Sequence, residues 1–421
     1  MVTVVTSTCN SLKKSKVPSP TAIKNRVYEL ESELIDIRRW LHQHPELSWQ
    51  EYESTKFIVD YLEALGLEVF QFDGHTGCWT VIHGDKKDSG NRTILLRADY
   101  DALPIQEDTG LPFASIHEGV FHGCGHETHA AMLLLATKIL VEYRSTFSGS
   151  VKILFQAAEE TANGAQYYVD QGIMDDVDAV FGCHTLSAIA PFNGPRISVN
   201  PGPRTAGTDE FHIHIQGMGC HGGMPHQGND AIVAASSIVM HLQTIVSRMT
   251  NPLDTLVITV GTLNAGTNYN VVADTATLTG TVRTYSKEVQ ESVAEKIRKV
   301  IEDTASALGC TATLEYITKT GPVIHTDPEM LQISHDAVVK LFGEEGLWDA
   351  PPMGGGDDFA YFIDKAPGVY AFLAASLPDD KGIVYPHHHP KVIFDEAALP
   401  WGAALHVQVA IDFLNKSRQE S

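Results

Sequence analysis

Alternation of strand-like and helical segments, interrupted once, is the feature that most restricts the folds open to this chain. Apolar runs such as "TILLRAD" and "VKILFQ" have the length and the Ile, Leu and Val content of buried strands, and helical segments follow them. Buried strands that alternate with helices predict an α/β sheet covered by helices on both faces. Between about residues 205 and 320 the predicted order becomes β-α-β-β-α-β, which is typical of a ferredoxin-like domain.

The interruption divides the 421-residue chain into a larger domain and a smaller domain inserted into it. The first 20 residues are polar and contain no apolar signal core, so we expect them to form a disordered tail, with a cleaved transit segment as the alternative. Apolar residues then recur at three- and four-residue steps from Ile23 to Leu41 and predict one amphipathic helix. The predicted parts are the tail (1–20), the first part of the larger domain (21–204), the inserted domain (205–320) and the second part of the larger domain (321–421).

Composition excludes several classes of partner. The chain has 30 basic and 52 acidic side chains, and its net charge of −22 disfavours binding to nucleic acid or to an anionic membrane. We find no apolar run that approaches the roughly 18 residues of a membrane-spanning helix. The six cysteines are scattered rather than clustered, which favours a reducing compartment. We therefore expect a cytoplasmic protein that binds neither nucleic acid nor membrane.

Potential metal ligands gather where the predicted strands end, which is where ligands bind to open α/β sheets. Their side chains are thiol, imidazole and carboxylate, the groups that bind zinc and similar divalent ions. A single histidine at a strand end is more often a structural hydrogen-bonding residue, but five such clusters at equivalent ends predict a metal site. The clusters are "RADYDALP" (97–104), "HGCGHETH" (122–129), "QAAEE" (156–160), "GCH" (182–184) and "HHHP" (387–390).

The adjacent carboxylates of Glu159 and Glu160 add a more specific indication. Two carboxylates at the end of one strand are costly to bring together unless a positive charge compensates them. In a metal site, one glutamate can bind the ion while the other acts as general base on water. Taken alone, the pair also fits an ordinary helix N-terminus, where acidic side chains interact favourably with the helix dipole.

Nine stretches resemble subfamily D of peptidase family M20, the amidohydrolases that include aminoacylases, hippurate hydrolases and plant hydrolases of indole-acetyl-amino acids. The resemblance implies a zinc-exopeptidase-like catalytic domain, in which helices cover a mixed sheet. It also implies that the inserted domain serves as a dimerisation or lid domain and that the protein is a homodimer. The stretches, in family order, are "LHQHPELSWQEYEST", "LLRADYDALPIQEDTG", "GCGHETHAAMLL", "FQAAEE", "GCH", "GCHGGMPHQGNDAI", "GTVRTY", "GGGDDFAYF" and "HHHPKVIFDE".

The same resemblance implies a site for two divalent ions, which could be zinc, manganese, cobalt or nickel, with a cysteine thiolate bridging them. The implied ligands are Cys124, His126, Glu160, His184 and His388. Glu159 is implied to be the general base. Asp101 is implied to orient a metal ligand by contacting that ligand and not the ion. Asp99 lies nearby in the sequence with a less defined role, and His122 and His129 flank the ligands as expected structural residues.

In the inserted domain, the resemblance implies three residues that act on the substrate. His221 would stabilise the tetrahedral intermediate, often across a dimer interface. Asn270 and Arg283 would hold the substrate's carboxylate, a group that suits the bidentate fork of arginine. The implied reaction is hydrolysis of the amide bond of an N-acyl amino acid by metal-activated water.

The chain departs from the usual family pattern at several positions. Glu127 and Thr128 stand where Asp and Gly are usual, Asp357 stands where Glu is usual, and "TLSAIAP" follows His184 in place of a Trp-containing stretch. These changes keep two alternatives open. One is a biosynthetic enzyme on the same scaffold that forms or rearranges an amide of a specialised metabolite. The other is a non-catalytic metal-binding dimer, against which the presence of Glu159 argues.

Overall fold

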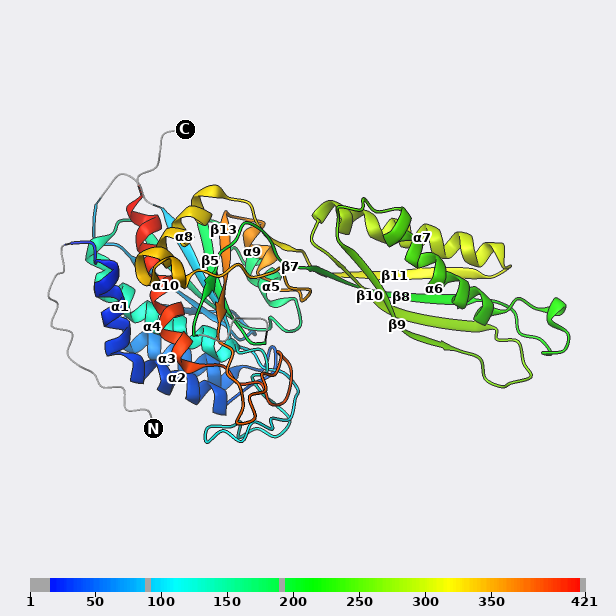
Figure 1. Cartoon of the computed structure of the whole chain (residues 1–421), viewed down its shortest axis with the longest axis horizontal. Helices are drawn as coiled ribbons and strands as arrows, with labels where there is room; N and C mark the ends of the chain where they lie inside the picture. The colour runs from blue at the N-terminus through cyan, green and yellow to red at the C-terminus, as the bar shows by residue number, and fades with distance from the viewer. Residues whose placement is uncertain (1–15, 88–91, 189–193, 417–421) are drawn as a thin grey trace. The chain divides into compact units, whose positions relative to one another are not determined.

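The structure is a computed structural model that describes residues 16–87, 92–188 and 194–416, so most of the predicted tail lies outside the described residues. The chain forms two compact units, drawn in Figure 1. Unit 1 comprises Met1–Gly202, His325–Pro351 and Tyr361–Ser421, and unit 2 comprises Pro203–Ile324 and Pro352–Ala360. Unit 2 therefore contains the segment 205–320 and also takes in a short stretch from later in the chain.

Within the described residues, unit 1 contains a mixed sheet of seven strands in the order β1-β2-β4-β3-β5-β13-β6. The strands are β1 (Val69–Gln71), β2 (Cys78–His83), β3 (Thr93–Asp99), β4 (Ser150–Gln156), β5 (Ala179–Leu186), β6 (Ile197–Ser198) and β13 (Gly368–Ala374). Strands β4, β3, β5 and β13 are parallel neighbours, whereas β1, β2 and β6 pair antiparallel. The carboxyl ends of the four parallel strands consequently meet at one edge, which confirms the predicted α/β class.

Helices cover both faces of this sheet. In Figure 1, α4 and α10 lie on one side of β5 and β13, and α5 lies on the other. Almost every residue of α4 and α10 is buried, because these two helices pack against each other and against the sheet. The helices of unit 1 are α1 (Pro20–Glu29), α2 (Glu31–Gln43), α3 (Tyr52–Ala64), α4 (His126–Tyr143), α5 (Gly164–Asp170), α8 (Pro328–Phe342) and α10 (Leu399–Asn415), with α9 (Ala360–Ile363) at a boundary between the units.

The single helix predicted from Ile23 to Leu41 is wrong, because the chain turns at Leu30 and forms α1 and α2 instead. Leu30 has φ −108° and ψ 10°, outside the helical region, and its N–H donates to the carbonyl of Val27 at 3.0 Å. Apolar residues on both sides of the break are buried in the same core, so their spacing continues through it. Periodicity alone therefore could not reveal the turn.

Unit 2 has an antiparallel sheet in the order β11-β8-β10-β9, covered on one face by two helices, and confirms the predicted β-α-β-β-α-β order. Side chains such as Ile238 and Leu242 of one helix and Ile297 of the other are fully buried against the sheet. The elements are β8 (Gly207–Gln216), α6 (Ala231–Arg248), β9 (Leu256–Ala265), β10 (Thr275–Thr284), α7 (Lys287–Ala307) and β11 (Thr311–Thr320). The short strands β7 (Gly202–Thr205) and β12 (Val323–His325) pair where the chain enters and leaves this unit.

Two helical segments are long and apolar enough to pass a length-and-composition test for membrane spans, although the sequence led us to expect none. They are Ala231–Arg248 and Glu396–Asn415. In the second, 83% of the apolar window is buried inside the structure, which is typical of a core helix. The first is α6, whose inner face supplies part of the core of unit 2. Such helices are weak evidence for a membrane span, and both have a structural role in the fold.

Candidate metal centre

The glycine-rich turn before α4 places Cys124 and His126 at the carboxyl edge of the sheet. The helix begins at His126, and the preceding Gly125 has φ +86°, a backbone conformation that residues with a Cβ rarely adopt. A Cβ at Gly125 would also lie 2.8 Å from the ring of Phe394 and 2.9 Å from the hydroxyl oxygen of Thr185. Glycine at this position therefore allows the turn to fit closely under its neighbours and hold both potential ligands.

Two groups of potential ligands in unit 1 share Cys124. The first contains Cys124, His126 and His184, and the second contains Cys124, Glu160 and His388, with the ligand atoms of each group within 4.8 Å of one another. The Sγ atom of Cys124 lies 3.7 Å from Nε2 of His184, and Nε2 of His388 lies 3.7 Å from Oε1 of Glu160. The structure thus brings together all five predicted ligands, in an arrangement that suits two ions bridged by one thiolate.

Two buried atoms of this cluster have no hydrogen-bond partner within the described parts of the chain. They are Nε2 of His126 and Oε1 of Glu160. The other ring nitrogen of His126, Nδ1, lies 3.1 Å from Oδ1 of Asp101, whose carboxylate can only accept, so Nδ1 carries a proton and Nε2 is the nitrogen left to bind an ion. Because buried polar atoms are normally paired, this donor set fits divalent cations.

Asp101 lies beside two candidate ligands, a position that fits the orienting role implied by the resemblance. Besides its contact with His126, its Oδ2 accepts hydrogen bonds from the hydroxyl of Ser48 at 2.7 Å and from the backbone N–H of Glu160 at 2.9 Å. One carboxylate therefore contacts two candidate ligands, one at the start of α4 and one in the turn after β4. Asp99 lies on the other side, with Oδ2 at 3.8 Å from Nε2 of His126 and with Arg97 as its ion-pair partner at 2.6 Å.

The electrostatics of the cluster also favour a cation. Burial, opposed by His126 and assisted by Asp101, raises the pKa of Glu160 to about 7. Burial also raises the pKa of the Cys124 thiol well above its usual range, with nearby Glu160 adding to the effect. Burial and neighbouring histidines lower the pKa of His184 well below its usual range, which keeps this imidazole neutral and able to bind metal. A divalent ion would stabilise the ionised thiol and carboxylate that burial otherwise disfavours.

Glu159 lies beside the ligands on a tightly held turn. Its Oε2 lies 3.9 Å from Nε2 of His126, and only 8% of the residue is exposed. The preceding residue, Ala158, has φ +60°, which is a strained conformation for alanine, and its N–H donates to Oε1 of Glu51 at 2.9 Å. Sequence reasoning missed Glu51, which is fully buried and holds this turn, although it lies inside one of the family-like stretches.

A second residue that sequence reasoning did not assign is His387, immediately before the predicted ligand His388. Its Nδ1 lies 3.6 Å from Sγ of Cys124, and its Nε2 accepts a hydrogen bond from the backbone N–H of Ser187 at 2.9 Å. Burial and the neighbouring His388 lower its pKa to about 3, so the ring is neutral at physiological pH. The run of three histidines in "HHHP" was a signal that more than one of them could reach the site.

The motif departures at Glu127 and Thr128 point away from the ligands. Glu127 is fully buried, where its Oε1 lies 3.1 Å from the guanidinium of Arg38 and 2.8 Å from Nδ1 of His42. The hydroxyl of Thr128 donates to the carbonyl of Gly125 at 2.6 Å. These contacts hold the turn and the start of α4, and the two side chains do not belong to the ligand cluster.

His122 and His129 differ in their surroundings, although the sequence predicted structural roles for both. His129 lies 2.5 Å from Oδ1 of Asp99 through Nδ1, and its Nε2 accepts from the backbone N–H of Thr185 at 2.9 Å. His122 is buried, and within the described residues neither of its ring nitrogens has a hydrogen-bond partner. Burial lowers the pKa of His122 to about 4, so it is uncharged at neutral pH.

The three predicted substrate residues lie in unit 2, at two different ends of its sheet. His221 forms a backbone bridge with Val271, and the N–H of Gly222 donates to the carbonyl of Asn270 at 2.8 Å, so His221 and Asn270 belong to one exposed loop cluster. Arg283 lies near the opposite end of β10 and donates to the carbonyl of Val282 at 2.9 Å. The strand between Thr275 and Arg283 spans roughly 26 Å at about 3.3 Å per residue.

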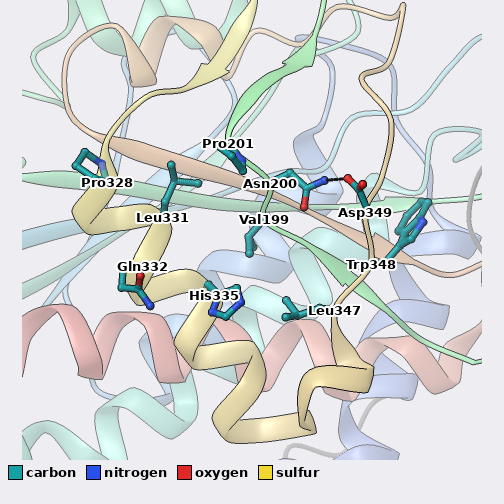
Figure 2. Close-up of a pocket in the computed structure, with 10 residues that line it drawn as sticks. All are labelled: Val199, Asn200, Pro201, Pro328, Leu331, Gln332, His335, Leu347, Trp348 and Asp349. Carbon is teal, nitrogen blue, oxygen red and sulfur yellow. Dashed lines mark hydrogen bonds between the residues drawn. The ribbon is translucent and has the colours of Figure 1, made fainter.

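A separate pocket in unit 1 has a volume of about 540 Å³ and lies between α8 and the segments around Val199 and Trp348 (Figure 2). Figure 2 shows a hydrogen bond between Asn200 and Asp349 at its rim, and Leu331 on its wall. None of the candidate ligands lines this pocket, so we assign the chemistry to the cluster around Cys124.

Known proteins are similar to this chain over most of its length. The family model described as "Peptidase family M20/M25/M40" matches residues 95–412. N-acetyl-L-cysteine deacetylase of Bacillus subtilis (strain 168) is 39% identical over 370 residues, which cover 88% of this chain and 85% of that protein. IAA-amino acid hydrolase ILR1-like 2 of Arabidopsis thaliana is 35% identical and covers 91% of this chain and 85% of its own length. The crystal structure of the Bacillus subtilis YXEP protein, described as a dinuclear metal-binding peptidase, matches with a TM-score of 0.80 and 33% identity, covering 93% of this chain and 100% of that one.

Proposed function

The chain belongs to peptidase family M20/M25/M40, and we propose that it is a dinuclear metal-dependent amidohydrolase that cleaves the amide bond of N-acyl amino acids. The observation that carries the proposal is the pair of ligand groups that share Cys124, with Glu159 beside them. The relatives named for N-acetyl-L-cysteine and for IAA-amino acids support a small N-acyl amino acid as the substrate.

Different residues of the site would bind the ions, accept a proton from water and orient the ligands. Cys124, His126, Glu160, His184 and His388 would hold two divalent ions. Their thiolate and imidazole donors suit zinc, cobalt or nickel, and the carboxylate also suits manganese. When bound, such ions supply Lewis acidity, which lowers the pKa of water and polarises a carbonyl.

Glu159 acts as the general base in this proposal. Its Oε2 accepts a proton from the attacking water and later returns that proton to the departing amine, so the two products are a carboxylic acid and a free amino acid. Asp101 keeps the proton of His126 on Nδ1, which leaves Nε2 available as a ligand throughout the reaction.

We also propose that two copies of the chain form a homodimer through unit 2. Arg283 and the cluster of His221 and Asn270 are separated along β10, so one unit cannot present all three residues to a single substrate molecule. A second copy could supply the missing residues. Strand β9 is an edge strand, and its Val257 and Leu263, with Met240 of α6, are exposed apolar side chains that a two-fold contact would cover.

We place the enzyme in the cytoplasm. Among the described residues the cysteines are free, which suits a reducing compartment. We prefer hydrolysis over the biosynthetic alternative, because all five candidate ligands are retained and the relatives named above are hydrolases. The non-catalytic alternative is disfavoured because Glu159 is retained and lies beside the ligands.

The test is a hydrolysis assay. Protein loaded separately with zinc, manganese, cobalt or nickel is incubated with N-acetyl, N-benzoyl and N-indole-acetyl amino acids, and amino acid release is measured. We expect release from at least one acyl series, abolished by a chelator and restored by metal. A fully metal-loaded protein that releases no amino acid from any of them would contradict the proposal.

A further inference from the structure

His387 contacts the shared cysteine of the candidate metal centre but belongs to neither ligand group. Its Nδ1 lies 3.6 Å from Sγ of Cys124, a distance at which an N–H group hydrogen-bonds to sulfur. The next residue, His388, has φ +64°, and its N–H donates to the carbonyl of Gly123 at 2.8 Å. This backbone contact anchors the histidine run directly beside the turn that carries Cys124.

The position of the proton on His387 follows from its other neighbour. The backbone N–H of Ser187 donates to Nε2 of His387 at 2.9 Å, so Nε2 presents a lone pair and carries no proton. A neutral imidazole has one N–H group, which must then be on Nδ1. The only N–H of the ring therefore faces the sulfur of Cys124.

The orientation of the ring is held on several sides. The hydroxyl of Ser187 donates to the carbonyl of Tyr385 at 2.8 Å, so Ser187 holds the histidine segment by two contacts. The ring of Phe394 packs edge-on against His387 at 5.4 Å, and the ring of His184 lies at the same centroid distance. Ser187 belongs to the stretch after His184 in which this chain departs from the usual family pattern.

We propose that His387 is a positioning residue, whose Nδ1–H donates a hydrogen bond to the Cys124 thiolate that bridges the two ions; this rests on the dinuclear function proposed above. The hydrogen bond withdraws electron density from the sulfur, so the thiolate donates less strongly to the metals, and their Lewis acidity is higher than an unassisted thiolate would allow. Hydrogen bonds to metal-bound sulfur are a general means by which proteins tune such centres.

The same geometry argues against His387 as a sixth ligand. Binding a metal through Nδ1 would require that nitrogen to lose its proton while Nε2 still accepts from Ser187, which would leave an imidazolate anion. If Nδ1 instead keeps its proton and donates to Sγ of Cys124, the ring stays neutral and no imidazolate anion forms.

The experiment compares three variants in the cobalt-substituted, full-length protein. H387L removes the donor, whereas H387N keeps an N–H group near the position of Nδ1. H389L is the matched control, since His389 stacks on Tyr385 at 4.4 Å and its Nδ1 accepts from the N–H of Lys391 at 3.1 Å. The readouts are metal ions per chain by elemental analysis, the near-ultraviolet thiolate-to-cobalt charge-transfer band, and amide hydrolysis activity.

We expect every variant to bind two ions per chain. H387L should move the charge-transfer band to longer wavelength and lower activity by about 10- to 100-fold, the range typical of residues that hydrogen-bond to metal ligands. H387N should return the band toward its wild-type position, and H389L should match wild type. If H387L does not fold, H387F keeps a flat ring beside His184 and Phe394 and carries the same expectation.

An unchanged band in H387L or H387F would overturn the hydrogen bond to sulfur. Loss of one ion from these variants would make His387 a ligand and would also overturn the inference. Absence of the band from wild-type protein is a different failure: it would remove Cys124 from the metal centre, and with it the dinuclear proposal on which this inference depends.

Discussion

Replacing Asp101 with asparagine tests most directly whether the cluster around Cys124 is a metal site. Asp101 receives two donors on Oδ2, from Ser48 and from the backbone of Glu160, and its Oδ1 faces Nδ1–H of His126. Asparagine has one acceptor oxygen and one NH₂ group. If the NH₂ group takes the place of Oδ1, it faces Nδ1–H of His126, which cannot accept unless its proton moves to Nε2. If the NH₂ group takes the place of Oδ2, it faces the backbone N–H of Glu160, which cannot accept at all.

The consequence for metal binding can be estimated from these contacts. If the proton of His126 moves to Nε2, that nitrogen can no longer bind an ion. If it stays on Nδ1, a buried donor is left without an acceptor, which costs about 1–3 kcal/mol. Loss of a residue that orients a metal ligand typically weakens metal affinity by about 10- to 100-fold. That factor corresponds to about 1.4–2.7 kcal/mol, since each tenfold change is about 1.36 kcal/mol.

The assay is titration of metal-free D101N protein with zinc in competition with a chromophoric chelator, followed by elemental analysis. The matched control is S48A, which removes one neutral donor from the same carboxylate at 2.7 Å and leaves its charge and its contact with His126 intact. We expect S48A to change affinity less than D101N does, because it removes one hydrogen bond from the carboxylate and leaves the acceptor of His126 Nδ1–H in place. Two ions bound to D101N with wild-type affinity would refute the assignment of Asp101 and His126.

Four further predictions follow from the proposed roles. E159Q should retain both metals but lose turnover by about 10²–10⁴-fold, because the amide cannot accept a proton; wild-type kcat at full metal content would contradict the role of Glu159. C124S should lower metal stoichiometry, because a hydroxyl is far less acidic than a thiol and bridges two ions poorly; unchanged stoichiometry would make Cys124 structural. R283L should lower the ratio of kcat/KM for free-acid substrates to kcat/KM for their amides by roughly 10- to 150-fold, the equivalent of about 1.5–3 kcal/mol for a charged hydrogen bond, whereas a purely structural arginine would leave the ratio unchanged. Light scattering at micromolar concentration should detect a dimer, and a species of only 45.9 kDa would reject it.

Strand ends indicated part of the candidate site, but the full ligand set rested on the family resemblance, because Cys124 and His126 lie at the start of α4 and His388 lies in the loop after β13. Asp99, Glu159 and His184 all lie at or near the carboxyl ends of parallel strands, where the topology of an α/β sheet brings them together. The β-α-β-β-α-β order of unit 2 was visible for a similar reason, since its elements are long and their periodicity is clear.

Several features could not be predicted, because they depend on contacts between residues far apart in the chain. The chain turns at Leu30 between α1 and α2, but the spacing of apolar residues continues unbroken across the turn. Periodicity therefore could not indicate that two helices form here. Glu51 supports the turn before Glu159 across 107 positions of sequence, from Glu51 to Ala158.

The sequence by itself determined which chemical groups are available and, for Asp99, Glu159 and His184, at which strand ends they occur, because residue type and strand periodicity are local properties. Only the tertiary structure decided which of three successive histidines faces which partner. His387 contacts the sulfur of Cys124, His388 approaches Glu160, and His389 stacks on Tyr385. The backbone at His388 has φ +64°, and that local turn, together with the N–H of Ser187 from a distant strand end, sets the direction of each ring. No pattern of residue types encodes such a direction, because it is fixed by packing and hydrogen bonds that form only when the chain has folded.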